Sequence, residues 1–255
     1  MAYMMVLVAV APLRAEAAHR SEMVSSLLFG EVVEVIDQSG DFYQIRCNYD
    51  QYEGWCQKTQ LITINNYLAV NQSNDLTAEF SNLLIVNGTD MQIPIGASLG
   101  LFVNKKLTIG KFEFIYMGAI AKPNPTLFTA DYIKHIAMLY LHAPYLWGGR
   151  SVFGIDCSGF VQQVFHFFAK TLPRDAHQQA VLGEVVGFLQ EAQCGDLAFF
   201  DNAEGRITHV GIMLDGQSII HASGRVRIDS IDNMGIINSD TGERTHNLRI
   251  VKRYL

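Results

Sequence analysis

One cysteine and two histidines in the second half of the chain have the residue types and settings of a nucleophile and its base. Cys157 follows Asp156, a residue type that favours helix N-caps, and apolar residues at helical spacing follow the cysteine. His209 and His221 lie in two β-type segments joined by a short loop. A thiol at a helix N-terminus is expected to lose its proton easily, because the helix dipole favours the thiolate. This pattern predicts covalent catalysis by a cysteine with an imidazole base.

The loop between the two histidine segments decides whether their imidazoles can meet. A two-residue turn at positions 215–216 would place His209 and His221 on opposite faces of the sheet. A three-residue loop at positions 214–216, with Gly216 in the left-handed conformation, would put His209 directly opposite His221. We expect the three-residue loop, with His221 fixing the tautomer of His209.

The surrounding motifs resemble those of the NlpC-type cysteine peptidases, which are papain-like hydrolases of bacterial cell-wall peptides. The matching motifs are Tyr145-Leu-Trp-Gly-Gly, Asp156-Cys-Ser-Gly-Phe, Leu172-Pro-Arg-Asp175, Gly195-Asp-Leu197, His209-Val-Gly211 and His221-Ala222. The resemblance is specific over residues 131–255. It implies an endopeptidase that cleaves after γ-D-glutamate in peptidoglycan stem peptides and needs no cofactor.

The resemblance also implies roles for residues around the nucleophile. Tyr145 corresponds to a tyrosine that helps to hold the oxyanion, with the backbone N–H of Cys157 as the other donor. From the residues alone, Asp156 is equally a helix cap and Arg174 equally a surface ion-pair partner. An aromatic that packs on the Gly-Gly turn is an interpretation that suits Trp147 better than Tyr145. By resemblance, Asp156, Ser158, Arg174 and Asp175 are expected to line the pocket for the D-glutamyl residue. Trp147 is also expected to bind substrate.

The first half of the chain contains short β-type runs separated by turn residues. We expect a hairpin over residues 32–47, a strand at 54–57 and another at 112–116. The uncharged run at residues 1–13 is interpreted as a barrel strand, because it lacks the basic start of a signal peptide.

Helices followed by strands in the second half predict an α+β fold. The expected helices cover residues 129–142, the stretch after Cys157, and 178–189. By analogy with the SH3-like barrels of relatives, we expect two small SH3-like β-barrels before a papain-like cysteine peptidase domain. The expected domains are 1–65, 66–122 and 123–255.

Two residues of the first barrel extend the resemblance towards substrate choice. In relatives with such barrels, a tyrosine and an acidic residue reach the catalytic groove, and Tyr52 and Glu22 fit these roles. The Glu22 carboxylate would pair with the ammonium of L-Ala and favour peptides with a free amino terminus. The alternative is that Glu22 is a solvated surface residue.

Composition excludes several other classes of protein. The net charge of −6 and the lack of a basic stripe argue against nucleic acid as a partner. No apolar run is long enough to span a membrane. The sequence has no paired zinc-ligand spacing, so no metal is expected. The other histidines, 135, 142, 166, 177 and 246, are expected to be structural or exposed.

Some alternatives stay open at the level of sequence. The same scaffold could serve an amidase or acyltransferase, and the barrels could serve a non-catalytic cell-wall binding protein. Cys47 and Cys56 are expected to be free thiols, although they could pair across two strands. We expect a monomer, which would be cytoplasmic if the chain is complete and periplasmic or secreted if a leader has been removed.

Overall fold

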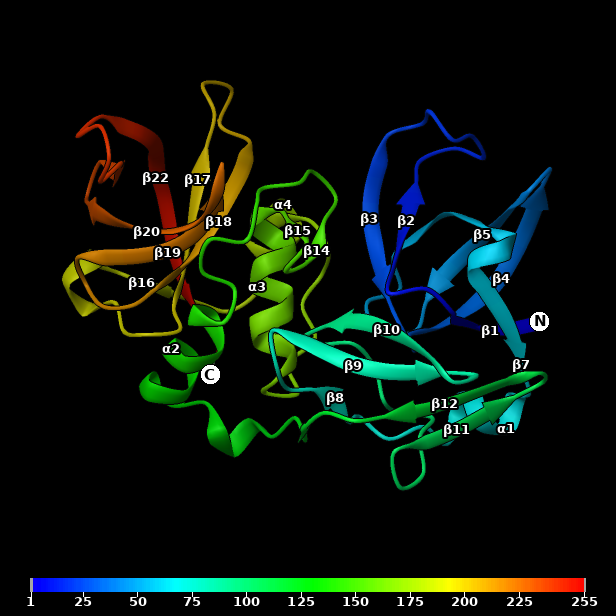
Figure 1. Ribbon diagram of the computed structural model, residues 1–255. Helices are drawn as coiled ribbons and strands as arrows, with labels where there is room; N and C mark the ends of the chain where they lie inside the picture. Colours follow the sequence, from blue (N-terminus) through cyan, green and yellow to red (C-terminus); the bar gives the residue numbers. More distant parts are fainter. Residues whose placement is uncertain (1, 255) are drawn as a thin grey trace. The chain divides into compact units, whose positions relative to one another are not determined.

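The computed structural model describes residues 2–254 and divides the chain into two compact units (Figure 1). The first unit holds the residues up to Pro123 together with Trp147–Phe153. The second holds Asn124–Leu146 and the residues from Gly154 on. Met1 and Leu255, which end the predicted ranges 1–65 and 123–255, lie outside the described residues. The division into three domains stays a prediction.

The first sheet of the first unit has seven antiparallel strands in the order β3-β2-β6-β5-β4-β1-β7. Its strands are β1 (Ala2–Val6), β2 (Val10–Arg14), β3 (Met23–Leu28), β4 (Val32–Ser39), β5 (Phe42–Cys47), β6 (Glu53–Gln57) and β7 (Leu61–Ile64), with a short 3₁₀ turn at Lys58–Gln60. The run at the start of the chain therefore forms strands, two rather than one. The predicted hairpin over 32–47 is the β4–β5 pair.

Residues 66–121 form a short helix and two smaller sheets. The elements are α1 (Asn66–Val70), β8 (Leu76–Thr77), β9 (Ser81–Val86), β10 (Thr89–Pro94), β11 (Lys106–Ile109), β12 (Phe112–Tyr116) and β13 (Ile120–Ala121). Four of the strands pair in the order β10-β9-β12-β11, and β8 pairs with β13. Asn87 and Gly88 join β9 to β10 with φ of 49° and 82°, as a tight hairpin turn of this twist requires. The interpretation of this region as a second barrel stays a prediction.

The segment Trp147–Phe153 is held in the first unit by buried polar contacts. Arg150 is fully buried and forms a two-pronged ion pair with Glu31, in which Nη1 lies 3.2 Å from Oε2 and Nη2 lies 3.0 Å from Oε1. Arg150 also donates to the carbonyl of Ser26 at 3.0 Å. Gly148 has φ of 76°, and a Cβ there would lie 2.4 Å from the carbonyl oxygen of Met23. The Gly-Gly turn is therefore required by the close approach of two backbones.

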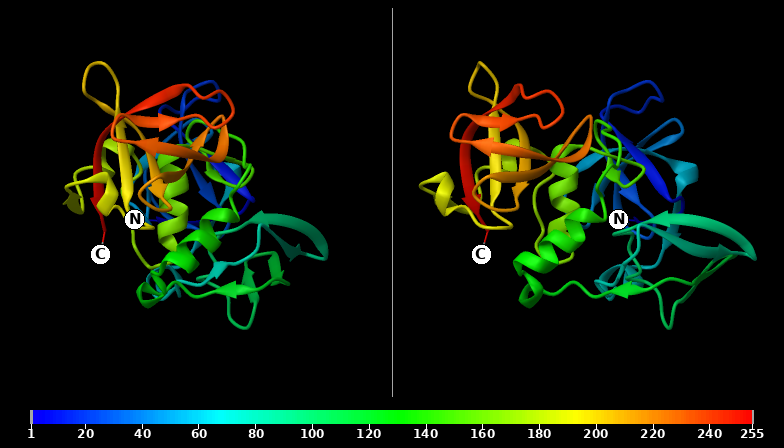
Figure 2. Two further views of the ribbon diagram at one scale, coloured as in Figure 1. Left: turned by 90° about the vertical axis from the view of Figure 1, so that its left-hand side faces the viewer. Right: turned by 60° about the vertical axis from the view of Figure 1, so that its left-hand side comes forward.

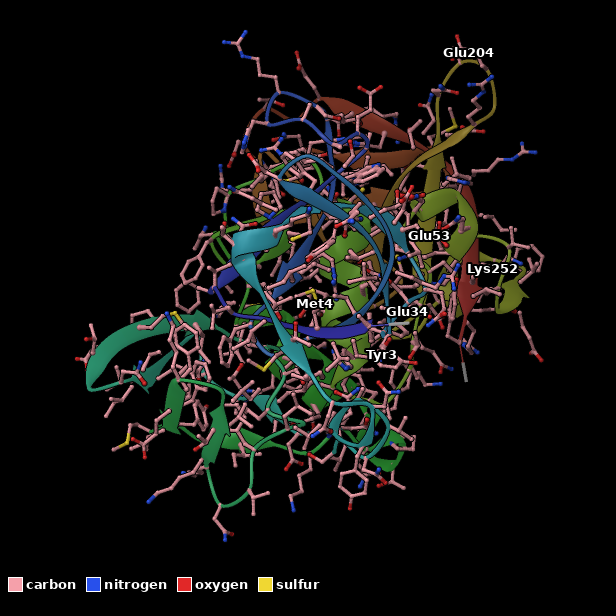
Figure 3. All side chains as sticks on the ribbon, turned by 90° about the vertical axis from the view of Figure 1, so that its right-hand side faces the viewer. Tyr3, Met4, Glu34, Glu53, Glu204 and Lys252 are labelled. Atoms are coloured by element: carbon pink, nitrogen blue, oxygen red, sulfur yellow. The ribbon has the colours of Figure 1, made fainter. Side chains whose placement is uncertain are left out.

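An exposed ion pair in the same unit contrasts with this buried one. Arg46 on β5 contacts Glu53 at 2.7 Å and Glu34 at 3.5 Å, and its side chain is 39% exposed. Glu34 and Glu53 are labelled in Figure 3. Water screens such a pair, so we expect it to contribute little to stability.

The second unit begins with helices. They are a 3₁₀ turn at Pro125–Leu127, α2 (Ala130–Met138), α3 (Cys157–His166), α4 (Ala176–Gln179) and a 3₁₀ turn at Leu189–Glu191. Thr129 caps α2, and Ile133, Ile136 and Ala137 form its buried face. The helix expected over 129–142 therefore forms but ends at Met138. Every residue of α3 from Cys157 to Phe165 is buried, because this helix packs on β18 and β19.

Six strands of the second unit form a closed antiparallel ring. They are β17 (Leu197–Asp201), β18 (Ile207–Met213), β19 (Ser218–Ser223), β20 (Arg225–Asp232), β21 (Gly235–Ile237) and β22 (Arg244–Arg253), and the β21–β22 pairing closes the ring. Apolar side chains such as Phe200, Met213, Ile219 and Ile236 form one buried cluster of these strands. Figure 2 shows α3 beside the strands that follow Leu197. Apart from the short strands β15 (Gly154–Ile155) and β16 (Glu184–Val186), helices come first and antiparallel strands after, as predicted.

The helix expected over residues 178–189 is wrong in most of its length. The helix α4 ends at Gln179, and residues 184–186 form β16, which pairs with β22. Gly183 has φ of 70°, which an α-helix does not accept. The apolar residues Val181 and Val185 are exposed, so a helix here would have no buried apolar face to stabilise it.

No helix among residues 2–254 is long and apolar enough to cross a membrane.

Candidate active site

Cys157 is the first residue of α3 and lies against the strand that carries His209. Asp156 is the N-cap, and its Oδ1 accepts the backbone N–H of Gly159 at 2.8 Å. The backbone N–H groups of Val210 and Ser158 hydrogen bond to the Cys157 sulfur. Since Val210 follows His209 in β18, the thiol lies beside the backbone of the residue next to the expected base.

Burial outweighs the helix N-terminus at this thiol. The pKa of Cys157 is raised to about 12, first by burial and then by the Asp156 carboxylate, although the Val210 N–H and Arg174 act in the opposite direction. The pKa of His209 is lowered well below its usual value by burial and by His221 and His246. Burial therefore opposes the easy loss of the thiol proton that the helix N-terminus favours. Both shifts favour a neutral thiol and a neutral imidazole in the free protein.

The two predicted histidines meet. His209 Nε2 lies 2.8 Å from His221 Nδ1, and both side chains are buried. Their rings are nearly perpendicular, at 83°, with centroids 5.0 Å apart. His221 is thus placed to orient the imidazole of His209, as predicted.

The register that brings them together differs from the predicted one by two residues. His221 pairs with Gly211 rather than with His209, and Leu214 donates to the carbonyl of Ser218 across a three-residue loop at 215–217. The loop has an odd number of residues, as predicted, so both imidazoles lie on the same face of the sheet. The predicted left-handed Gly216 is wrong, because the Asp215 carboxylate accepts the N–H of Gln217 at 2.9 Å and closes the turn instead.

Gly211 makes the diagonal contact between the imidazoles possible. A Cβ at Gly211 would lie 2.8 Å from the Cβ of His221 and 2.7 Å from Cδ1 of Ile219. The missing side chain leaves the space across which His221 reaches His209, two residues along β18.

Asp229 continues the line beyond His221, a feature that the sequence reasoning missed. Its Oδ2 lies 2.9 Å from His221 Nε2, and both side chains are 1% exposed. Arg227, directly opposite His221 in the sheet, contacts both carboxylate oxygens of Asp229 at 2.8 Å. The signal was the alternation of Arg227 and Asp229 on one face of β20, but the strand was expected to end at residue 228.

His246 packs on the expected base, although it was grouped with the structural or exposed histidines. Its ring is stacked on that of His209 at 27°, with centroids 4.1 Å apart. Phe200 contacts both rings, at 5.7 Å from His209 and 5.9 Å from His246. The base is therefore held between aromatic side chains of three different strands.

Tyr145 is a hydrogen-bond donor at neutral pH. Its pKa is raised to about 12, first by burial and then by the negative charges of Cys157 in its thiolate form and of Asp156, so the hydroxyl keeps its proton. Its backbone N–H donates to the carbonyl of Gly224 at 3.0 Å, which fixes the residue to the loop between β19 and β20. The protonated hydroxyl can stabilise negative charge, as an oxyanion donor must.

Three of the residues expected to bind substrate form one buried cluster. Arg174 contacts Asp156 Oδ2 at 2.5 Å through Nη2 and Asp156 Oδ1 at 3.1 Å through Nη1, which also donates to Ser158 Oγ at 2.9 Å. Arg174 is 2% exposed, so it is not a surface ion-pair residue. Asp156 both caps the helix and binds Arg174, so neither of its two expected roles excludes the other. Asp175 lies at the start of α4.

Comparison with known proteins identifies the family. The profile of the NlpC/P60 family matches residues 142–245, and that of the bacterial dipeptidyl-peptidase Sh3 domain matches residues 13–61. The chain is 30% identical over 215 residues to the gamma-D-glutamyl-L-lysine dipeptidyl-peptidase of Bacillus subtilis (strain 168), covering 78% of this chain and 71% of that protein. The chain belongs to the NlpC/P60 family of cysteine peptidases.

Other relatives of this NlpC/P60 peptidase cover more of its length. The protein of the same name from Bacillus cereus is 28% identical, over 89% of this chain and 76% of that protein. A crystal structure of an NlpC/P60 family protein from Bacillus cereus matches with a TM-score of 0.81 at 22% identity, covering 99% of each chain. An NlpC/P60 endopeptidase of Photobacterium damselae matches with a TM-score of 0.73 at 16% identity, covering 97% of this chain and 70% of that one. These structures share the fold.

The remaining predicted site residues of this NlpC/P60 chain lie in the first unit. The indole N–H of Trp147 donates to Glu22 Oε1 at 2.7 Å, so these two residues are brought together. Trp147 is 60% exposed and does not pack as a buried aromatic. Tyr52 is partly buried against the core that contains Cys47 and Cys56. The two cysteines are free thiols, as expected.

Within residues 2–254, no group of three or more His, Cys, Asp or Glu side chains is arranged to hold a metal ion.

Proposed function

We propose that this NlpC/P60 peptidase hydrolyses the bond between γ-D-glutamate and the following L-diamino acid in peptidoglycan stem peptides. The observation that carries the proposal is the buried line from His209 through His221 to Asp229, beside a cysteine at a helix start. The Bacillus relatives, whose names state a gamma-D-glutamyl-L-lysine dipeptidyl-peptidase, support this choice of substrate.

The proposed acylation step begins with the neutral pair. His209 removes the thiol proton as Cys157 Sγ attacks the γ-carbonyl carbon of D-glutamate, and the electron pair of the C=O bond moves to oxygen. The Tyr145 hydroxyl and the Cys157 backbone N–H donate to that oxyanion. The C–N bond then breaks, and His209 gives its proton to the leaving amine of the diamino acid.

The proposed deacylation step uses the same groups with water as the nucleophile. His209 takes a proton from water, which attacks the thioester carbon, and the thiolate leaves and regains the proton from His209. The products are a peptide that ends in D-glutamate and a peptide or amino acid that begins with the diamino acid.

The proposal also includes the fold type of the peptidase domain and the residues that recognise the substrate. We propose that the nucleophile helix packed on the strand of the base corresponds to a papain-like arrangement. The α-carboxylate of D-glutamate is proposed to bind beside Arg174, whose guanidinium also holds Asp156 and Ser158. Glu22, held by the Trp147 indole, is the proposed partner for the ammonium of a free amino terminus. The N-terminal sheets are proposed to form two SH3-like barrels.

Mass spectrometry of reaction products tests the proposal. Wild type incubated with L-Ala-γ-D-Glu-L-Lys or its diaminopimelate analogue should release L-Ala-D-Glu and the free diamino acid, and Cys157→Ala should release neither. The N-acetylated peptide should be cleaved roughly 30-fold less well, because one side of a charge pair is lost. Release of L-Ala, or of ammonia alone, would instead indicate a different amidase specificity.

A further inference from the structure

We propose that Asp229 is a positioning residue that selects the reactive tautomer of His209 through His221, which makes Nδ1 of His209 the basic nitrogen. The inference deepens the proposed function and rests on it only for its kinetic arm. The tautomers themselves are a property of the free protein.

Asp229 has a full set of partners that only an ionised carboxylate accepts. Its Oδ1 accepts from Arg227 Nη2 at 2.8 Å and from the backbone N–H of Ser239 at 2.9 Å. Its Oδ2 lies 2.9 Å from His221 Nε2 and 2.8 Å from Arg227 Nε. Burial alone would raise the pKa of Asp229, but the hydrogen bonds from His221, Arg227 and Ser239 outweigh it and hold the pKa below its usual range. An ionised carboxylate has no hydrogen to donate, so His221 Nε2 must carry one.

The position of the hydrogen on His221 also determines its position on His209. A neutral imidazole has one N–H, so His221 with hydrogen on Nε2 has a bare Nδ1. That nitrogen lies 2.8 Å from His209 Nε2, which must therefore carry the hydrogen between them. The neutral His209 is then bare at Nδ1, the one nitrogen left to take the thiol proton.

The partners of Asp229 also predict what an amide at this position would do. In Asp229→Asn, the two donors at the Oδ1 position, Arg227 Nη2 and the Ser239 N–H, hold the amide oxygen. The NH₂ group then faces His221 Nε2, which must accept, and also Arg227 Nε at 2.8 Å, a donor that must move away. His221 would carry its hydrogen on Nδ1, and His209 would carry its hydrogen on its own Nδ1, where the base is needed. Both tautomers invert, and the accompanying structural change is a displacement of Arg227 Nε from the NH₂ group.

The test uses whole protein labelled with ¹⁵N in the histidine rings. Long-range ¹H–¹⁵N spectra at about pH 8, above the usual histidine pKa, report which nitrogen carries hydrogen. Signals are assigned with His209→Gln and His221→Gln. Wild type should show both rings protonated at Nε2, and Asp229→Asn should show both at Nδ1. With L-Ala-γ-D-Glu-L-Lys, kcat of Asp229→Asn should fall by roughly 100-fold or more with KM nearly unchanged, because a wrong tautomer removes the base and not the binding.

Asp240→Asn is the matched control. Asp240 is the exposed partner of Arg227 and Arg225. Asp240→Asn therefore makes the same chemical change in the same network without changing the tautomer of His221. Its tautomers should equal those of wild type, and its kcat should lie within about threefold of wild type. Asp229→Glu, which keeps a carboxylate, should restore the wild-type tautomers in part.

Wild-type His209 with hydrogen on Nδ1 would overturn the assignment, and this result needs no variant. Unchanged tautomers in a folded Asp229→Asn protein would also overturn it. A wild type with the expected tautomers that cleaves no stem peptide would contradict the proposed function and support the role of Asp229.

Discussion

Burial sets the protonation states of the two reacting side chains. The raised pKa of Cys157 and the lowered pKa of His209 both favour the proton on sulfur in the free protein. The reactive thiolate then forms only as the proton moves to His209. Since the thiolate is the reactive form, the Cys157 thiol of the free enzyme is expected to oxidise slowly and yet to react with a bound substrate.

The pH profile follows from these directions. Activity requires His209 without an extra proton, and its pKa lies well below 6.5. The value of kcat/KM should therefore stay flat as the pH falls from about 8 to about 6.5, and should fall only at lower pH, as His209 becomes protonated. Initial rates at low substrate concentration measure this. An acid limb centred at or above about 6.5 would contradict the predicted burial of a neutral base.

His246 is expected to tune this limb. In His246→Phe the ring stacked on His209 remains, but a titratable neighbour that lowers the pKa of His209 is removed. The acid limb should move to higher pH, by up to about one unit, with the plateau nearly unchanged. His246→Ala should also lower the plateau kcat, roughly tenfold, because the ring that orients His209 is lost.

The control for His246 is the exposed His177 on α4, which should show neither effect as His177→Phe. Equal acid limbs in wild type and His246→Phe would show that the stacked imidazole has no influence on the base.

At this scale, sequence predicts residue types but not their electrostatic balance. Cys157, His209, His221 and Tyr145 could be chosen from motifs and alternation. The protonation state of the Cys157 thiol could not be predicted from the sequence. The helix N-terminus lowers its pKa and burial raises it, and the extent of burial is known only from the structure. Asp229 and His246 come from strands β20 and β22, and their contacts with the imidazoles depend on the closure of the ring.

At the scale of elements, two neighbouring strands and one glycine hold the imidazoles in contact. His221 faces Gly211, so its ring reaches diagonally to His209. In Gly211→Ala the new Cβ would meet the Cβ of His221 at 2.8 Å, which must shift one of the strands. We expect kcat to fall roughly 100-fold, with a smaller effect on KM, because displacements near 1 Å at a base are costly.

Gly187→Ala is the control, since the nearest atom to its added Cβ is 4.0 Å away. Its kinetics should match wild type. A Gly211→Ala protein with wild-type kcat would show that the diagonal contact tolerates a shift of the strands.

Loops decide what sequence can predict at this scale. The parity of the β18–β19 loop could be predicted from the need for both imidazoles on one face. Its register could not, because the Asp215 carboxylate closes a turn that moves the loop by one residue. The helix predicted over 178–189 is wrong for a related reason. Residues of β16 find backbone hydrogen-bond partners at the edge of β22, and helical periodicity in the sequence does not reveal this pairing.

At the scale of the whole molecule, neither compact unit is a single continuous segment. The chain enters the second unit at Asn124, returns to the first for Trp147–Phe153, and leaves it again at Gly154. This return was not predicted, because the prolines at 123 and 125 indicated a single boundary there, which left the Gly-Gly segment within the expected peptidase domain. The buried Arg150–Glu31 pair that holds the segment links positions far apart in sequence.

Removal of one partner of this pair should be costly. Glu31→Gln leaves the fully buried Arg150 with an unmatched charge, so the free energy of unfolding should fall by roughly 3–5 kcal/mol. Denaturant unfolding followed by fluorescence measures the change. Glu53→Gln, at the exposed Arg46 pair, is the control and should cost less than about 1 kcal/mol. Equal losses in the two variants would contradict the difference in burial.

Trapping of the nucleophile tests the central claim most directly. An L-Ala-γ-D-Glu diazomethyl ketone places its reactive carbon where the scissile carbonyl would lie, and peptide mapping by mass spectrometry locates the adduct. We predict modification of Cys157 alone, prevented by excess L-Ala-γ-D-Glu-L-Lys and lost in His209→Ala, with little reaction of the L-glutamyl analogue. Modification of the partly exposed Cys194 at a similar rate, or equal reaction of the two stereoisomers, would contradict the account.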